Sequence, residues 1–179
     1  MVYILMVDGY EDTEMIAPMD MLSRAEIPVT RVGVMGKTVT SKLGIVTETD
    51  ITADEVDFSD CEMVFLPGGP GTHHYYDKPV VDAALSYAVE HDCYIAAICA
   101  APSVLAAKGL LHGKNAVCHF SVADKMGDAK LQKQMVCVDV RMITGCGAGA
   151  SIDFGLTMVS ELRGQEISDK IRHSIGYAD

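Results

Sequence analysis

The chain has 179 residues, of which 49% are hydrophobic, and it carries a formal net charge of −11. A chain of this length suits one domain with a sizeable buried core, so we expect residues 1–179 to form a single domain. The acidic surface repels phosphate backbones and anionic lipids, which argues against nucleic acid and membrane partners. No apolar run approaches the ~18 residues that a membrane helix requires.

The N-terminal residues and the cysteines bear on the cellular compartment. The opening MVYILMVDGYED has no basic leader and no small-residue cleavage site, so it predicts a first strand and not a signal peptide. None of the six cysteines forms a C-x-x-C pair, and a chain of this size argues against a disulfide framework. We therefore expect a cytoplasmic protein whose cysteines are small buried hydrophobes unless their surroundings indicate otherwise.

Apolar strand-like runs alternate with helical patterns along the chain. The predicted strands are, in order, VYILMV, PVTRVGVM, CEMVFLPGG, CYIAAIC, NAVCHF and QMVCVDVRMITG, the last as a strand pair or one bent strand. The predicted helices cover 15–26, 79–92, the segment after Cys99, a short polar stretch over 121–132, then 151–163 closed by Gly164, and 166–175. TVTSKLGIVTETD is polar, β-branched and interrupted by glycine, which favours a hairpin or an edge excursion.

The predicted strands are mostly continuous apolar runs, which indicates a sheet that is covered on both faces. We therefore expect a doubly wound α/β fold, with a mostly parallel sheet and helices on both faces. In such folds the working site lies beyond the carboxyl ends of the strands. Four strand ends are informative: VDGYEDTEM, with Glu11, Asp12 and Glu14 near a helix start, then LPGGPGTHH, AICAAP and VCHF.

Cys99 lies at a junction between a predicted strand and a predicted helix. Ala97 and Ala101, two residues to either side, are small enough for the tight turn of a nucleophile elbow, and Pro102 suits a first helical turn. A thiol at a helix N-terminus meets exposed amides and the positive end of the helix dipole, so we expect a depressed pKa. The alternative is an ordinary buried cysteine in an alanine-rich turn.

Two neighbouring strand ends add candidate partners for Cys99. Gly68 and Gly69 let backbone amides approach a ligand, so together with the amide of Ala100 they predict an oxyanion site. If this motif is taken alone, it is simply a glycine turn. His119 is expected to end a strand on the same rim. Because a cysteine and a glutamate already lie there, a functional role for this histidine is favoured over a purely structural one.

Two further motifs carry no function in this interpretation. GCGAGA at 145–150 matches a dinucleotide-binding pattern, but no later strand ends in the expected acidic residue, so we assign these glycines to helix–strand packing. His73-His74 and Cys118-His119 lack the usual spacing of metal ligands, so we expect no metal site.

Taken together, the motifs resemble the ThiJ/PfpI superfamily, in the branch of the parkinsonism-associated protein deglycase and its bacterial relatives. The resemblance covers essentially the whole chain and rests on ILMVDGYEDTEMIAPMDMLSRA, FLPGG, IAAICAAPSVLA, HFSVADKM and IDFGLTMVSELRG, in that order. It implies a flavodoxin-like three-layer sandwich of the class I glutamine amidotransferase-like type. It also implies a homodimer that needs no cofactor.

The resemblance implies roles for individual residues. Cys99 matches the nucleophile, Glu14 the acid that hydrogen-bonds its sulfur, and His119 the nearby histidine. Gly69 and Ala100 match the amides that face the reacting oxygen, and Arg24 matches an arginine near the site at the dimer interface. The chain departs from the branch at TGCGAGAS, where Cys146 and Ala148 replace an arginine and a proline. Because an alanine follows Cys99, where the protease branch has histidine, peptidase activity is disfavoured.

The implied substrate is a small carbonyl compound. The branch is associated with glutathione-independent glyoxalase activity and with deglycation of adducts of 2-oxoaldehydes. An alternative of another class is an oxidative-stress sensor that uses oxidation of Cys99 with little or no turnover, because a reactive thiol is also an oxidisable one. A chaperone-like binding module is a third possibility, suggested only by the eleven methionines.

Overall fold

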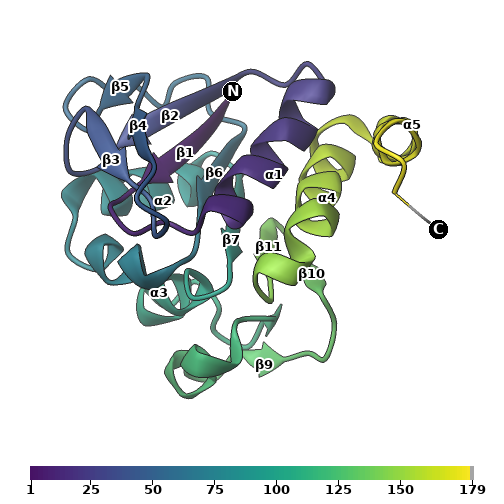
Figure 1. Cartoon of the computed structure of the whole chain (residues 1–179). Coiled ribbons are helices and arrows are strands. Elements are labelled where there is room, and N and C mark those ends of the chain that lie inside the picture. Colours follow the sequence, from purple (N-terminus) through teal and green to yellow (C-terminus); the bar gives the residue numbers. More distant parts are fainter. Residues whose placement is uncertain (178–179) are drawn as a thin grey trace.

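The computed structural model describes residues 1–177 and is built on one seven-stranded sheet (Figure 1). The strand order is β10-β11-β7-β6-β1-β2-β5. The strands are β1 (Val2–Met6), β2 (Val29–Gly33), β5 (Ile51–Thr52), β6 (Met63–Leu66), β7 (Tyr94–Ile98), β10 (Val136–Asp139) and β11 (Met142–Gly145). Every pair is parallel except β10 with β11. The prediction of a mostly parallel sheet is therefore confirmed.

Helices cover both faces of the sheet. On one face lie α2 (Pro79–Glu90) and α3 (Pro102–Ala107), whose apolar side chains join one buried cluster. On the other face α1 (Asp12–Arg24) and α4 (Ser151–Arg163) lie side by side and build a second cluster (Figure 1). The chain thus has the doubly wound arrangement that the sequence predicts and the flavodoxin-like three layers that the resemblance implies.

The alternation of side chains along β1 explains why its sequence is apolar throughout. All five residues of VYILM are buried. Tyr3 and Leu5 enter the cluster beneath α2 and α3, whereas Ile4 and Met6 enter the cluster beneath α1 and α4. A strand with a core on each face needs an apolar residue at every position, so its sequence does not alternate between apolar and polar residues.

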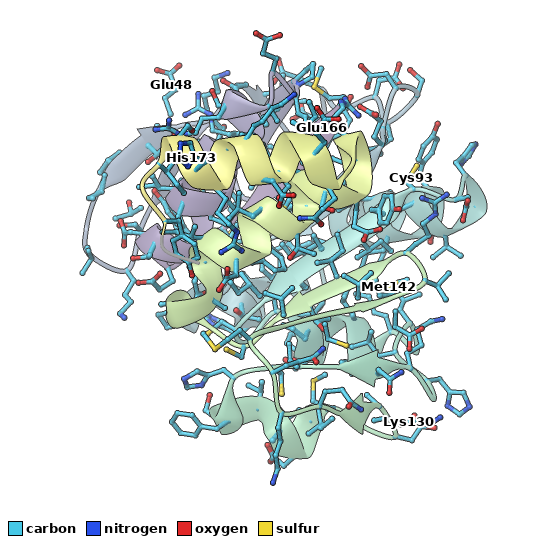
Figure 2. All side chains as sticks on the ribbon, turned by 90° about the vertical axis from the view of Figure 1, so that its right-hand side faces the viewer. Glu48, Cys93, Lys130, Met142, Glu166 and His173 are labelled. Carbon is cyan, nitrogen blue, oxygen red and sulfur yellow. The ribbon has the colours of Figure 1, made fainter. Side chains whose placement is uncertain are left out.

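Two small sheets lie outside the main one. The hairpin of β3 (Thr38–Thr40) and β4 (Val46–Glu48) is antiparallel, as predicted for that segment. The prediction of a strand over NAVCHF is wrong beyond its first two residues. β8 (Asn115–Ala116) pairs with β9 (Lys130–Leu131), and Figure 2 shows Lys130 at the end of the molecule away from the helix over Gln165–Ser174. β10 takes the place beside β11, and β8 and β9 form a separate two-stranded sheet.

The segment after β8 also differs from the prediction of a helix over 121–132. It forms the short 3₁₀ helix η2 (Phe120–Lys125), a turn at Gly127, which has φ of 59°, and then β9. A glycine in the left-handed region ends helical geometry, so the helix does not continue through the polar residues up to 132.

The last two helices follow the prediction closely. Gly164, with φ of 92°, ends α4 and precedes α5 (Gln165–Ser174). Figure 2 shows α5 lying across the outer side of the molecule, with Glu166 and His173 near its two ends. Its Ser168 hydroxyl donates to the Leu156 carbonyl of α4 at 2.8 Å, which holds the two helices together. Within residues 1–177 no helix is long and apolar enough to cross a bilayer.

Candidate active site

Cys99 occupies a strained turn directly after β7. Its φ is 64°, in the left-handed region that a residue with a side chain rarely adopts, so the predicted elbow is confirmed. Two hydrogen bonds hold the turn: the Cys99 N–H donates to the Gly145 carbonyl at 2.8 Å, and the Cys99 carbonyl accepts from the His119 N–H at 2.8 Å. The side chain is half-buried, so the sulfur is fixed in position and still reachable.

Glu14 places a buried carboxyl beside this sulfur. It lies in the first turn of α1, where the side chain of the capping residue Glu11 accepts a hydrogen bond from the Glu14 N–H at 2.9 Å. Glu14 is 1% exposed, and its Oε2 is buried without a hydrogen-bond partner among the described residues. The Cys99 thiol and the Ala148 N–H lie close enough to the carboxyl to lower its pKa slightly. Burial raises the pKa of Glu14 to about 7, because the charged form loses its hydration.

The expected depression of the Cys99 pKa is wrong. Burial, and then the neighbouring Glu14 carboxylate, raise the pKa of the Cys99 thiol to about 12. The amides of Gly69 and Ala100 act in the opposite direction but are outweighed. Because α3 is only six residues long, its dipole offers little to offset the loss of hydration. The thiol therefore needs a nearby base to become a nucleophile, and Glu14 is in contact with it.

The glycine turn after β6 brings backbone donors to the same sulfur. The Gly69 N–H and the Ala100 N–H lie close enough to the Cys99 sulfur to favour its charged form. Gly69 has φ of 102°, which a side chain would disfavour. At Gly68 an added Cβ would lie 2.2 Å from a Glu14 carboxyl oxygen and 2.6 Å from the Cys99 Cβ. The turn thus needs glycine both for its conformation and for the close approach of β6 to the elbow.

His119 reaches the same rim from a loop, not from the strand end that the sequence predicts. It caps η2, and its Nδ1 accepts from the Ser121 N–H at 3.3 Å and lies 2.8 Å from the Ser121 hydroxyl. Because Nδ1 is engaged, the remaining ring nitrogen is the one available to a ligand. A Cβ at Gly147 would lie 3.4 Å from the His119 ring and 3.9 Å from the Cys99 sulfur, so the ring and the sulfur flank the same glycine.

These groups line a cavity of about 340 Å³. Its lining residues are Glu11, Glu14, Lys42, Gly69, Pro70, Cys99, Ala100, His119, Ser121 and Ala148. Lys42 was not predicted from the sequence, since it lies in the β3–β4 hairpin and not at the end of a sheet strand. Its N–H donates to the Tyr10 carbonyl at 2.8 Å, which docks the hairpin over the loop after β1. Its ammonium group lowers the pKa of Glu14, against the larger effect of burial.

Arg24 does not join this cavity within one chain. It ends α1, ten residues beyond Glu14, which corresponds to about 15 Å along a helix. It forms an ion pair with Asp20 at 2.9 Å. A role for Arg24 at the site therefore depends on a second chain and stays a prediction.

Cys146, the residue that departs from the branch pattern, also lies outside the cavity lining. Its thiol contacts the Met135 sulfur at 3.7 Å. The His73 and His74 rings lie in tilted contact, with centroids 3.9 Å apart, and likewise lie outside the lining. Across residues 1–177 no group of three or more His, Cys, Asp or Glu side chains is arranged to hold a metal ion.

Comparison with known proteins agrees with this architecture. The chain is 33% identical over 175 residues to the Parkinson disease protein 7 homolog of Danio rerio, covering 94% of this chain and 93% of that protein. It is 31% identical over 170 residues to the glutathione-independent glyoxalase DJR-1.2 of Caenorhabditis elegans, covering 94% and 91%. The solved structure of oxidized DJ-1 from Toxoplasma gondii superposes with a TM-score of 0.94 at 28% identity, covering 99% of this chain and 98% of that one. Residues 1–161 match the DJ-1/PfpI family, and the chain belongs to this family.

Proposed function

We propose that this protein is a cofactor-independent enzyme that acts on reactive 2-oxoaldehydes or their adducts, in the manner of a glyoxalase or deglycase. The observation that carries the proposal is the Cys99 sulfur, in contact with the buried Glu14 carboxyl and with two backbone amides in a small cavity. A nucleophile, a base and oxyanion donors in one place suit addition to a carbonyl carbon. A relative named as a glutathione-independent glyoxalase, 31% identical, supports the same class.

The first step depends on the proximity of the Glu14 carboxyl to the Cys99 sulfur. Glu14, with a pKa of about 7, is a base at neutral pH and takes the proton of the Cys99 thiol. The sulfur then attacks the aldehyde carbon, and the carbonyl electron pair moves onto oxygen to give a hemithioacetal. The amides of Gly69 and Ala100 face this reacting centre and stabilise the charge that develops on oxygen.

The later steps need proton transfer and one water molecule. For methylglyoxal, the hemithioacetal loses its C–H proton to a base and regains a proton on the adjacent carbon, which gives a thioester of lactate. Glu14 and His119, which both line the cavity, serve as the proton carriers. Water then cleaves the thioester, releasing lactate and the Cys99 thiol, so that methylglyoxal and water are the only reactants consumed.

The test is the variant Cys99→Ser, with Cys118→Ser as the matched control because Cys118 is also half-buried but lies outside the cavity. We expect Cys99→Ser to lower kcat/KM for methylglyoxal by about 10³-fold or more, as loss of a nucleophile does in other enzymes. Cys118→Ser should stay within about twofold. Methylglyoxal loss and lactate formation are the measurements, and undiminished turnover by Cys99→Ser would contradict the scheme.

The second candidate is an oxidative-stress sensor based on the same sulfur. It is favoured by the half-exposed Cys99 beside a carboxyl that is able to hydrogen-bond a sulfinate, and by the structural match to an oxidized family member. Mass spectrometry after mild peroxide treatment separates the two functions when it is combined with a panel of 2-oxoaldehydes. Selective addition of two oxygens at Cys99 without aldehyde turnover would favour the sensor.

The proposal includes a homodimer in the cytoplasm. Large apolar side chains on α1 and on the hairpin are exposed, among them Ile16 at 46%, Leu43 at 71% and Val46 at 67%. Burying such side chains against a second copy would remove apolar area from water. All six cysteines are free, which suits a reducing compartment. Light scattering measures the molar mass in solution, and a monomer at working concentration would contradict the dimer.

A further inference from the structure

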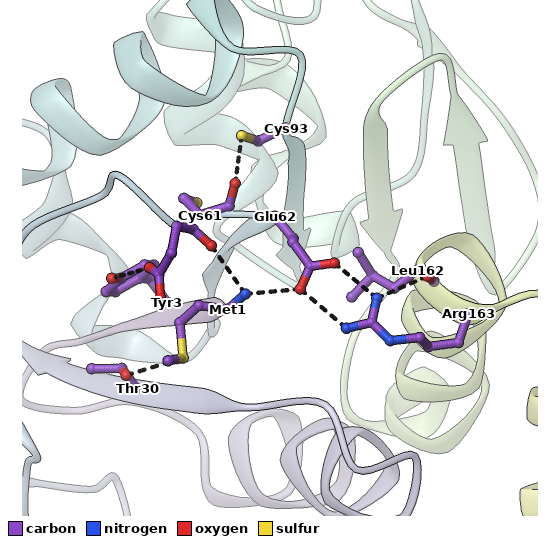
Figure 3. Close-up of polar contacts among 9 residues, drawn as sticks. Met1, Tyr3, Thr30, Cys61, Glu62, Cys93, Leu162 and Arg163 are labelled. Atoms are coloured by element: carbon purple, nitrogen blue, oxygen red, sulfur yellow. Dashed lines mark hydrogen bonds and ion pairs between the residues drawn. The ribbon is translucent and has the colours of Figure 1, made fainter.

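A second pair of thiols lies at the opposite end of the strands that build the active site. Cys61 comes two residues before β6, and Cys93 comes directly before β7. Both pack into the apolar cluster beneath α2 and α3, where Cys93 is 7% exposed and Cys61 is half-buried. Figure 3 shows the two residues close together, and Figure 2 shows Cys93 near one edge of the molecule.

The two side chains contact one another. The Cys93 thiol donates a hydrogen bond to the Cys61 carbonyl at 2.9 Å. Burial, and then the nearby Cys93 thiol, raise the pKa of the Cys61 thiol to about 12. The parallel register pairs Met63 with Tyr94, so the two cysteines are one position out of register on neighbouring strands. Strand spacing and rise then put their Cα atoms about 6 Å apart, which is within the range that a disulfide spans. Both cysteines precede their strands, so the alternation of faces along a strand does not separate them, and both side chains enter the cluster beneath α2 and α3.

The surroundings hold both backbones in place. The Cys61 N–H donates to the Phe58 carbonyl at 2.9 Å, and the Tyr94 N–H donates to the Glu62 carbonyl at 2.9 Å. The Glu62 carboxylate accepts hydrogen bonds from the Arg163 guanidinium at 2.8 and 3.1 Å, as Figure 3 shows. Because the segment that carries Cys61 is tied to both β7 and α4, the thiols do not have to be brought together by a backbone movement.

We propose that Cys61 and Cys93 are a second oxidation site, which closes to an intramolecular disulfide under a hydroperoxide. Cys61, the more exposed of the two, loses its proton to solvent, and its sulfur attacks the distal peroxide oxygen and becomes a sulfenic acid while an alcohol or water leaves. The sulfur of Cys93 then attacks the Cys61 sulfur, an S–S bond forms, and the sulfenic oxygen leaves as water. Two thiols lose two electrons and the peroxide gains them, so the step balances.

This pair is separate from the proposed catalytic sulfur. Cys93 and Cys99 flank the five residues of β7, which puts them about 20 Å apart along the strand. Cys99 therefore has no access to this pair and oxidises independently, whereas each thiol of the pair has a partner that captures its sulfenic acid. The protein thus contains one sulfur suited to higher oxidation states and one pair suited to reversible disulfide formation.

The experiment treats the full chain with hydrogen peroxide, blocks the remaining thiols, and maps them by mass spectrometry without reduction. We expect a peptide that joins Cys61 to Cys93, its loss on treatment with dithiothreitol, and monomer-length migration on a denaturing non-reducing gel. The crosslink encloses about 30 residues, so the oxidised protein should unfold at a Tm higher by about 5 °C or more.

Variants make the test specific. Cys61→Ser and Cys93→Ser should each abolish the linked peptide and the shift in Tm, while Cys137→Ser, which removes another buried cysteine, should leave both unchanged. The proposal is overturned if both thiols of the unmutated protein stay alkylatable while Cys99 is oxidised, or if the linkages join different molecules. Because the mapping uses the unmutated protein, a variant that fails to fold does not affect the result.

Discussion

The two ends of β7 carry the same residue type in opposite settings. Cys93, before the strand, packs beside Cys61 in the apolar cluster and donates a hydrogen bond to the Cys61 carbonyl. Cys99, after the strand, is held at φ of 64° with its sulfur facing a carboxyl and two amides. Both thiols have a raised pKa because both are partly buried. Acidity alone therefore does not separate them; the groups in contact with each sulfur do.

The carboxylates near these cysteines differ in the same way. Glu62, beside Cys61, is paired with Arg163, which lowers the pKa of Glu62 to about 2. Glu14, beside Cys99, is buried without a cation in contact, and its pKa is raised to about 7. One carboxylate is a permanent structural anion and the other titrates near neutrality. Only the second is able to exchange a proton with a sulfur during turnover.

The variants Glu14→Gln and Glu62→Gln should separate these roles most strongly. We expect Glu14→Gln to lower kcat/KM for methylglyoxal by about 10²-fold or more, because the thiol loses its base. In the unmutated protein kcat/KM should rise with pH through about 7, where Glu14 becomes ionised, and then level off. That rise should be absent from Glu14→Gln and retained in Glu62→Gln. A pH–rate profile of each protein is the measurement, and an unchanged profile in Glu14→Gln would remove Glu14 from the mechanism.

Gly68→Ala tests the close packing between the glycine turn after β6 and the Cys99 elbow. The added Cβ would lie 2.6 Å from the Ile98 carbonyl oxygen and would also clash with Glu14 and Cys99. A main-chain oxygen at the end of a strand cannot move aside as a flexible side chain can. We expect the free energy of unfolding to fall by about 3 kcal/mol, with a loss of turnover. Gly149→Ala is the control, since its Cβ would meet only the Met135 methyl at 3.6 Å. Urea unfolding of both variants checks this, and equal stabilities would contradict the packing.

The fold was predictable because it depends on patterns that lie within single segments. Continuous apolar runs such as VYILM predict a buried parallel strand, and small residues around Cys99 predict the elbow. The strand over NAVCHF was not predictable in the same way, since β8 pairs with β9 in a separate two-stranded sheet while β10 takes the place beside β11. That fact depends on pairing between distant segments, which an apolar run does not specify.

The site was predictable in its residue types more than in its electrostatics. Strand ends identified Cys99 and the glycine turn, because parallel strands bring these ends together. His119 was identified from a predicted strand that does not form, and it reaches the site from the loop before η2. The helix dipole suggested a depressed thiol pKa, whereas burial and the Glu14 carboxylate raise it. Desolvation depends on how much of the molecule surrounds a group. The sequence does not specify this burial. It also does not specify that the hairpin folds over the loop after β1, which is what brings Lys42 to the cavity.

Stability as a function of pH should distinguish the two glutamates again. Ionised Glu14 is destabilising because its folded pKa, about 7, exceeds its ordinary value of 4.5. The stability that it contributes is therefore full below pH 4.5 and lost as pH rises through about 7. Glu14→Gln should thus be more stable than the unmutated protein at pH 8, by about 2–3 kcal/mol.

Glu62 should behave in the opposite way. Its folded pKa is lowered to about 2, so its contribution is present above its ordinary value of 4.5 and lost as pH falls through about 2. Glu62→Gln should therefore be less stable at pH 8, by about 1 kcal/mol, since solvent weakens a half-exposed pair. Urea unfolding at pH 4 and pH 8 measures both differences, and a destabilised Glu14→Gln at pH 8 would contradict the assigned burial cost.

The smallest effect is expected from Lys42→Met, which removes a charge from the cavity and keeps most of the side-chain volume. The Lys42 ammonium favours the ionised form of Glu14, so without it the pKa of Glu14 should rise further. The midpoint of the pH–rate profile should then move upward by a fraction of a pH unit, with a similar plateau. Lys125→Met, which removes an exposed charge at the end of η2, should leave the midpoint in place. A downward shift of the midpoint in Lys42→Met would show that the lysine acts on the substrate or on Cys99 and not through Glu14. The direction of this small shift therefore decides which group of the active site the hairpin lysine acts on.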